Sequence, residues 1–309
     1  MLDSELTAYS EYCTILRGRS RATVSAYIWN VRKFSEFLNA RGDEIFSATR
    51  ADVEDWLKSL FFDRHNSNSS RAVKLAAVRD FYAWLVRERY LSASPCQDIP
   101  SPKFAQHSAR KFSTEELRQI FAAPDLSTEI GIRDLAVLMV LYGAGPRVSE
   151  IASLTLRQMQ FTAETCTLTF FGKGAKERTV KLERVPTAAI RNWWQIRVAA
   201  SKMDEPLFTS LTRDRGRRGY GITKESINAI LKKYAVRFGI PDADAFVHKM
   251  RSTFASDLYD QIKDPLVVAA KMGHEDVKTT MRYIENSQTA LNSGKISNAR
   301  WRELTKQEG

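Results

Sequence analysis

Residues 246–256 read FVHKMRSTFAS, and they contain the most informative spacing in the chain. In a helix, His248 and Arg251 lie three positions apart and therefore on one face. Three more segments accompany this one: GAGPRVSEI at 143–151, FFGKGAKERTV at 170–180 and MGHEDVKTTMRYIE at 272–285. Together they supply arginines, histidines, a glycine-flanked lysine and a tyrosine. These side chains can attack a phosphodiester, neutralise its developing charge and protonate the leaving group without a metal ion.

The part of the chain that precedes these segments has the apolar spacing of helices. Apolar residues recur every three or four positions from Val24 to Leu38, which predicts a helix. Thr49 and Asp52 form a capping-box pattern that predicts the start of another helix. We therefore expect a small helical bundle over residues 1–95.

A linker and a second domain are expected next. Residues 96–111 contain prolines and small polar residues but no apolar repeat, which indicates an exposed connection. Ser113 and Glu116 form a second capping-box pattern, which predicts the first helix of a domain over 112–288. Most of this domain has helical spacing.

Two short runs in the second domain predict strands. Residues 166–171 and 178–182 are rich in β-forming residues and flank a turn with two glycines, the pattern of a hairpin. A tail at 289–309 completes the chain. The expected fold is therefore mainly α with a small β-sheet.

The four quoted segments resemble, in the same order, the boxes of the tyrosine recombinase (phage integrase) family. The helical first part also resembles that family's core-binding half. The resemblance implies an α-helical, SAM-like core-binding domain that binds DNA and a mixed α/β catalytic domain. The chain departs from the family at Pro146, where many members have leucine, and at Ser252, where a histidine often follows the second arginine. Neither departure removes a catalytic group.

The implied activity is that of a Xer-like site-specific recombinase, a DNA strand transferase that acts through a 3′-phosphotyrosyl intermediate and a Holliday junction. In this interpretation Tyr283 is the nucleophile. The planar forks of Arg147 and Arg251 would bind the non-bridging phosphate oxygens, a task for which lysine is less suited. The predicted catalytic residues are Arg147, Lys173, His248, Arg251, His274 and Tyr283.

The resemblance also assigns roles to the remaining members of this set. Lys173 would be the general acid for the leaving 5′ oxygen, with Lys176 as the weaker candidate. His248 would shuttle a proton or orient the phosphate, and His274 would donate a hydrogen bond to it. Attack by tyrosine conserves the bond energy, so we expect no cofactor and no metal ion. The sequence has neither a GxxxxGK[ST] nor an HExxH motif.

Further DNA contacts are expected from basic side chains outside the catalytic set. The loop RDRGRRG at 213–219 fits a phosphate-contacting loop and an ordinary solvated loop equally well. The predicted DNA-binding residues are Arg71, Lys74, Lys176, Arg178, Arg213, Arg215, Arg217 and Arg218.

Composition agrees with a polyanion-binding protein. Lysine and arginine number 47 against 36 acidic residues, for a net charge of +11, and most of this excess follows residue 105. Cys13, Cys96 and Cys166 lack the spacing of a disulfide framework or a zinc site, so we expect buried, reduced thiols. The chain has no apolar run of membrane-spanning length, and its first ten residues do not resemble a secretory signal. We expect a cytoplasmic, nucleoid-associated protein that binds no membrane.

The expected partner is double-stranded DNA at an inverted-repeat-like site, bound by a homotetramer on paired sites, with no accessory protein specified. Two alternatives stay open: a type IB topoisomerase, which rejoins the same strand, and a non-catalytic DNA-binding protein. A metal-dependent transposase fits worst, because no acidic trio stands out.

The tail at 289–309 has a sparse apolar set, Leu291, Ile296, Trp301 and Leu304. We expect this set to be frayed in a monomer, and the resemblance implies that it docks on a neighbouring subunit. Removal of residues 290–309 is then expected to spare DNA binding and weaken synapsis.

Overall fold

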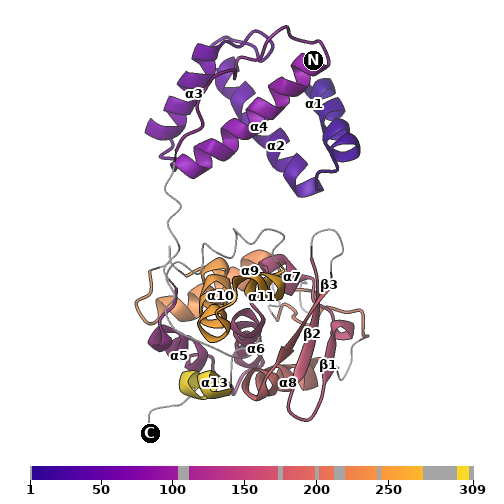
Figure 1. Ribbon diagram of the computed structural model, residues 1–309, viewed down its shortest axis with the longest axis vertical. Helices are drawn as coiled ribbons and strands as arrows, with labels where there is room; N and C mark the ends of the chain where they lie inside the picture. Colours follow the sequence, from indigo (N-terminus) through magenta and orange to yellow (C-terminus); the bar gives the residue numbers. More distant parts are fainter. Residues whose placement is uncertain are drawn as a thin grey trace. The chain divides into compact units, whose positions relative to one another are not determined.

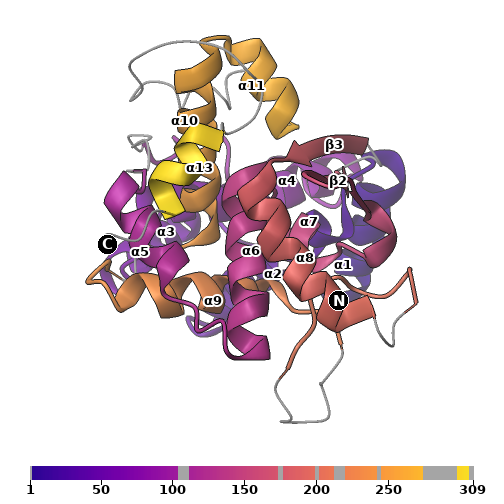
Figure 2. The same cartoon turned by 90° about the horizontal axis from the view of Figure 1, so that it is seen from below.

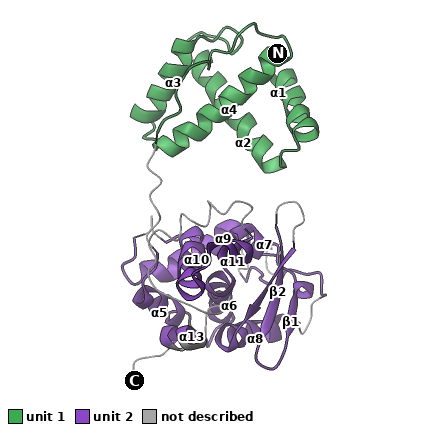
Figure 3. Cartoon of the chain, in the orientation of Figure 1, with its two compact units in different colours: residues 1–106 green, residues 107–309 purple. Residues whose placement is uncertain are grey.

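The computed structural model describes residues 2–103, 111–172, 177–198, 202–211, 220–241, 245–273 and 298–305. The chain divides into two compact units, residues 1–106 and 107–309 (Figure 3). The expected fold class, mainly α with a small β-sheet, is confirmed. Across the described ranges, no helix is both long and apolar enough to cross a membrane.

Unit 1 is a helical bundle around an aromatic core. Phe34, Trp56 and Tyr82 are buried at its centre, and the Tyr82 hydroxyl donates a hydrogen bond to the Ile45 carbonyl at 2.6 Å. The capping box of Thr49 and Asp52 is confirmed. Its elements are α1 (Leu2–Glu11), the π-helical turn η1 (Tyr12–Leu16), α2 (Arg21–Asn39), α3 (Arg50–Phe62) and α4 (Asn68–Arg87).

Unit 2 combines helices with a three-stranded antiparallel sheet of order β1-β2-β3. The capping box of Ser113 and Glu116 is confirmed at the start of α5. The elements are α5 (Thr114–Ala122), α6 (Glu129–Ala144), α7 (Val148–Ala152), the 3-10 turn η2 (Leu156–Gln158), β1 (Met159–Phe161), β2 (Cys166–Phe171), β3 (Glu177–Leu182), α8 (Arg184–Val198), α9 (Lys224–Val236), α10 (Val247–Ile262), α11 (Pro265–Met272) and α13 (Asn298–Thr305).

Helix α6 is the central element of unit 2. From Leu135 onward its sequence is apolar on all sides, as a helix surrounded by protein requires, and residues 136–144 are buried throughout. It packs against α8, α10 and β3 (Figures 1 and 2). The carboxyl end of this helix is therefore held firmly, and the predicted Arg147 follows it directly.

The end of the tail packs on unit 2 of its own chain, which corrects our expectation of a frayed segment. Helix α13 contacts α5 and α8. Trp301 is 1% exposed and lies edge-on against Tyr142, with ring centroids 5.2 Å apart. Leu304 is fully buried. The spacing of Trp301 and Leu304 was read correctly, but the receiving surface is formed by residues distant in sequence, which a local pattern cannot reveal. Leu291 and Ile296 lie outside the described residues, and docking of the tail on a neighbouring subunit stays a prediction.

Candidate active site

A tight turn at the end of α6 presents Arg147. Gly145 caps the helix in the left-handed conformation, with φ of +52°. A Cβ atom at this position would lie 2.2 Å from Cδ1 of Phe254, so only glycine fits. Arg147 then occupies the extended N-cap position of α7. Arg147 thus stands at a helix start.

The Arg147 guanidinium is fixed by two partners and stays partly open to solvent. Its Nη1 donates to Glu150 Oε1 at 3.0 Å, and its Nη2 donates to the Gly273 carbonyl at 3.0 Å. The side chain is 43% exposed. An exposed, anchored guanidinium can donate hydrogen bonds to a phosphate at little further cost in side-chain entropy.

Arg251 reaches the same place from α10, and it is buried. Its Nη1 donates to the Gly145 carbonyl, and its Nη2 donates to the Met272 carbonyl at 2.7 Å. Only 3% of the residue is exposed. Arg147 and Arg251 therefore both bond to carbonyls at the end of α11, and Arg251 also bonds to the Gly145 carbonyl at the end of α6.

His248 lies in the first turn of α10, three residues before Arg251, and is exposed. The pKa of His248 lies below its ordinary value, mainly because the part of the ring that faces the domain is desolvated. The positive charge of Arg251 is the second cause. The ring is therefore neutral at physiological pH. Ser252, at the position where family members often have histidine, donates its hydroxyl hydrogen bond to the His248 carbonyl at 2.9 Å.

We predict that His248 titrates below the ordinary histidine pKa of about 6.5, measured by NMR with His248→Gln to assign the signal among four histidines. The unfolded chain then binds more protons than the folded one between the two pKa values. The contribution of His248 to stability is therefore complete above about pH 6.5 and is lost as the pH falls through the folded pKa. A folded pKa at or above the ordinary value would contradict this prediction.

Glu150 is a buried acidic residue at this site that the sequence analysis did not predict. Its carboxylate is 3% exposed and accepts hydrogen bonds from the Arg147 side chain, the Arg147 backbone at 2.9 Å and Arg178 at 2.7 Å. Burial alone would raise the pKa of Glu150, but the charge and hydrogen bond of Arg178, followed by those of Arg147, hold it below its ordinary value. The available signal was its N3 position in α7, three residues after the N-cap.

Arg178 does not have the exposure expected of a DNA contact. Its side chain is 11% exposed, and its guanidinium bonds to Glu150 and to two backbone carbonyls. The sequence analysis named it among the basic side chains expected to contact DNA. The structure instead places it inside the domain, behind Arg147.

The two predicted DNA contacts of unit 1 lie on α4 and are partly buried. Arg71 stacks on Phe61 with its guanidinium 4.7 Å from the ring centroid. Lys74 donates to Asn66 Oδ1 at 2.9 Å. Desolvation and the neighbouring Arg64 lower the pKa of Lys74. Contact of either side chain with DNA stays a prediction.

Several predicted residues lie outside the described residues. They are the catalytic candidates Lys173, His274 and Tyr283, the alternative Lys176, and the loop residues Arg213, Arg215, Arg217 and Arg218. Of the six predicted catalytic residues, the structure brings Arg147 and Arg251 to neighbouring carbonyls at the end of α11, those of Gly273 and Met272, and places His248 one turn before Arg251 on α10.

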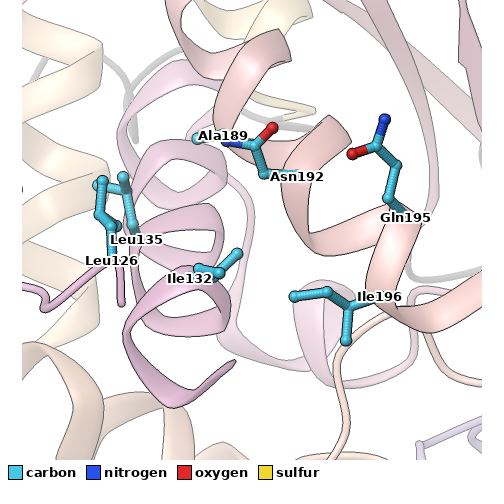
Figure 4. Close-up of a pocket in the computed structure, with 7 residues that line it drawn as sticks. All are labelled: Leu126, Ile132, Leu135, Ala189, Asn192, Gln195 and Ile196. Carbon is cyan, nitrogen blue, oxygen red and sulfur yellow. The ribbon is translucent and has the colours of Figure 1, made fainter. Parts of the chain in front are cut away.

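A pocket in unit 2 lies away from these arginines. It lies between α6 and α8 and is lined mainly by aliphatic side chains, with Asn192 and Gln195 at its edge (Figure 4). Its α6 residues, Ile132 and Leu135, belong to the first turns of that helix, whereas Arg147 follows its last turn. The pocket is therefore separate from the candidate active site.

Comparison with known proteins defines the class of this chain. A family model described as "Phage integrase family" matches residues 110–290, and one described as "Phage integrase, N-terminal SAM-like domain" matches residues 6–89. Tyrosine recombinase XerC of Oceanobacillus iheyensis is 31% identical over 286 residues, which cover 91% of each chain. Tyrosine recombinase XerD of Shewanella oneidensis is 28% identical, over 89% of each chain. The chain therefore belongs to the phage integrase family of tyrosine recombinases.

Solved structures share the fold at lower identity. The XerH site-specific recombinase bound to a palindromic difH substrate matches with a TM-score of 0.72 and 17% identity, over 92% of this chain and 82% of that one. A lambda integrase dimer bound to a COC′ core site matches with a TM-score of 0.68 and 13% identity, over 91% and 94%. The architecture of both units is thus that of known recombinases.

Proposed function

We propose that this chain is a site-specific DNA recombinase that cleaves and rejoins strands through a 3′-phosphotyrosyl link at Tyr283. The observation that carries the proposal is the convergence of Arg147 and Arg251 on the end of α11, where they bond to the carbonyls of Gly273 and Met272. Two fixed guanidiniums can neutralise the charge that builds on the non-bridging oxygens during attack. Lys173, His248 and His274 would complete the site.

The reaction fits the chemistry of the named groups. The Tyr283 oxygen attacks the phosphorus while its hydroxyl proton passes to the neutral ring of His248, the P–O5′ bond breaks, and Lys173 supplies a proton to the leaving oxygen. The DNA is then held as a phosphotyrosyl ester of similar energy to the bond that was cleaved. A 5′ hydroxyl from a second strand can reverse the step and release the tyrosine. Rejoining to that second strand would give the Holliday junction.

The assembly that we propose is a homotetramer on two inverted-repeat-like sites. The related XerH structure holds a palindromic substrate, and lambda integrase structures contain a dimer on a core site and a tetramer on a Holliday junction. Each of these supports double-stranded DNA as the partner of this chain. Phosphate contacts should make its binding strongly dependent on salt.

The two alternatives receive less support. A type IB topoisomerase would use similar side chains but rejoin the same strand, and a non-catalytic protein would not need a buried clamp arginine. Two relatives that align over 91% and 89% of this chain are named tyrosine recombinases. Neither alternative is therefore favoured.

A paired-site assay tests the proposal. We define the suicide duplex as a nicked duplex of DNA that flanks the gene, designed to lose a short fragment after cleavage and so trap the covalent intermediate. We expect an adduct on a 3′ phosphate and, with two intact sites in one plasmid, exchanged strands. Relaxation of a plasmid without such sites, in the absence of exchange, would favour the topoisomerase. The absence of both adduct and relaxation would favour a non-catalytic protein.

A further inference from the structure

Arg178 belongs to β3 but contacts three segments outside the sheet. It pairs across the sheet with Phe170, and its guanidinium stacks on that ring at 4.6 Å from the centroid. From there Nη1 donates to the carbonyl of Ala144 at 3.3 Å and to that of Lys271 at 3.2 Å, while Nη2 donates to Glu150 at 2.7 Å. One side chain thus joins β3 to the ends of α6 and α11 and to the first turn of α7.

These contacts lead to the two groups that hold Arg147. Glu150 Oε2 accepts from Arg178, while Oε1 accepts from Arg147. The other anchor of Arg147 is the Gly273 carbonyl, two residues after the carbonyl of Lys271 to which Arg178 bonds. Gly273 is left-handed, with φ of +64°, and a Cβ there would lie 3.0 Å from Cδ of Arg178. Arg178 therefore packs closely against both anchors.

We propose that Arg178 is a positioning residue for cleavage, which fixes the direction of the Arg147 guanidinium through Glu150 and the end of α11. This inference rests on the proposed function, because it assumes that Arg147 binds the scissile phosphate. Arg178 does not itself touch DNA. A planar fork is required, because one guanidinium must reach a carboxylate and two carbonyls at once, which a lysine ammonium on its flexible stem does less well.

The chain contains a matched control in Arg133. Its side chain is also 11% exposed, it pairs with the buried carboxylate of Asp134, and it donates to the Thr209 carbonyl at 3.1 Å. Each carboxylate keeps a second cation when its buried arginine is removed, Lys233 for Asp134 and Arg147 for Glu150. Arg133 lies near the start of α6, about 16 Å along the helix axis from its end. A purely structural cost should thus be similar for both arginines.

The test measures the rate of adduct formation on the suicide duplex at saturating protein, with the dissociation constant and thermal unfolding measured in parallel. We expect Arg178→Met to lower the rate about 10- to 100-fold, the loss typical when outer partners that orient metal ligands are removed. Arg178→Lys should recover only part of this loss. Binding of the duplex should change less than about threefold. Arg133→Met should lower stability to a similar degree and leave the cleavage rate within about threefold.

A double-mutant cycle separates positioning from independent effects. If Arg178 acts through Arg147, then Arg178→Met combined with Arg147→Ala should cleave no more slowly than Arg147→Ala alone, because residues that share one task are not additive. Fully multiplied losses would overturn the inference. So would an equal loss of rate in Arg133→Met and Arg178→Met.

The pH dependence of the cleavage rate also distinguishes positioning from a purely structural role, because a purely structural role would not change it. The charged groups that the structure places against the Glu150 carboxylate are Arg178 from β3 and Arg147 from the start of α7. Without Arg178 the pKa of Glu150 should rise, so the acid limb of the cleavage profile should shift to higher pH in Arg178→Met and stay in place in Arg133→Met. An unshifted limb would overturn the inference. If Arg147→Ala cleaves normally, the proposed function itself fails, whatever Arg178→Met does.

Discussion

Replacement of Tyr283 by phenylalanine is expected to abolish the covalent adduct on the suicide duplex. Phenylalanine lacks the oxygen that attacks the phosphorus. Deletion of the nucleophile in a serine protease lowers the rate on the order of 10⁶-fold, and a comparable loss here would leave no detectable adduct after hours of incubation. Denaturing gel electrophoresis of labelled DNA measures the outcome.

The control for this variant is Tyr220→Phe, which removes the same atom from a side chain that is 68% exposed. It should form the adduct at the normal rate. DNA binding by both variants should match that of the unaltered chain, because the hydroxyl adds little to a contact dominated by phosphate charges. An adduct that persists in Tyr283→Phe would reassign the nucleophile and refute the mechanism.

Replacement of Trp301 by alanine should destabilise unit 2 by about 3–5 kcal/mol, the usual cost of truncating a fully buried tryptophan. The indole fills a site between Phe121 and Tyr142, with centroid distances of 5.9 and 5.2 Å. For a domain of this size we expect the unfolding midpoint of unit 2 to fall by roughly 6–20 °C. Circular dichroism during heating measures the shift.

Trp29→Ala serves as the comparison, since Trp29 is 53% exposed on unit 1. An exposed site of this kind normally changes stability by less than about 0.5 kcal/mol. Equal midpoints for the two variants would show that α13 does not pack on its own chain in solution. The destabilisation also revises our expectation for removal of residues 290–309. Because α13 forms part of the core, such a truncation should lower stability as well as weaken synapsis.

Local patterns predicted much of the fold. Thr49 with Asp52 and Ser113 with Glu116 marked helix starts that the structure confirms, because a capping box depends only on residues three positions apart. The strand at 166–171 was also predicted within its observed bounds. Strand β1 was missed, because three residues are too few to show an alternating pattern.

Only part of the site was predicted, because local patterns do not reveal contacts between residues that are far apart in sequence. Motif order identified Arg147, His248 and Arg251, whose roles depend on residue type and order along the chain. The burial of Arg178 and the importance of Glu150 depend on contacts with α6 and α11, far away in sequence. Lys173, His274 and Tyr283 stay predictions.

The backbone ends that surround the arginines have an electrostatic consequence. The last carbonyls of a helix carry the negative pole of its dipole, roughly half an elementary charge. The carbonyls that Arg147, Arg178 and Arg251 contact belong to the ends of α6 and α11. The negative ends of two helix dipoles thus hold three positively charged arginines close together. The partial charges of these helix ends are smaller than the charges of the arginines and do not cancel them. The surplus positive potential stays available to an arriving phosphate, so pyrophosphate should compete with DNA at this site.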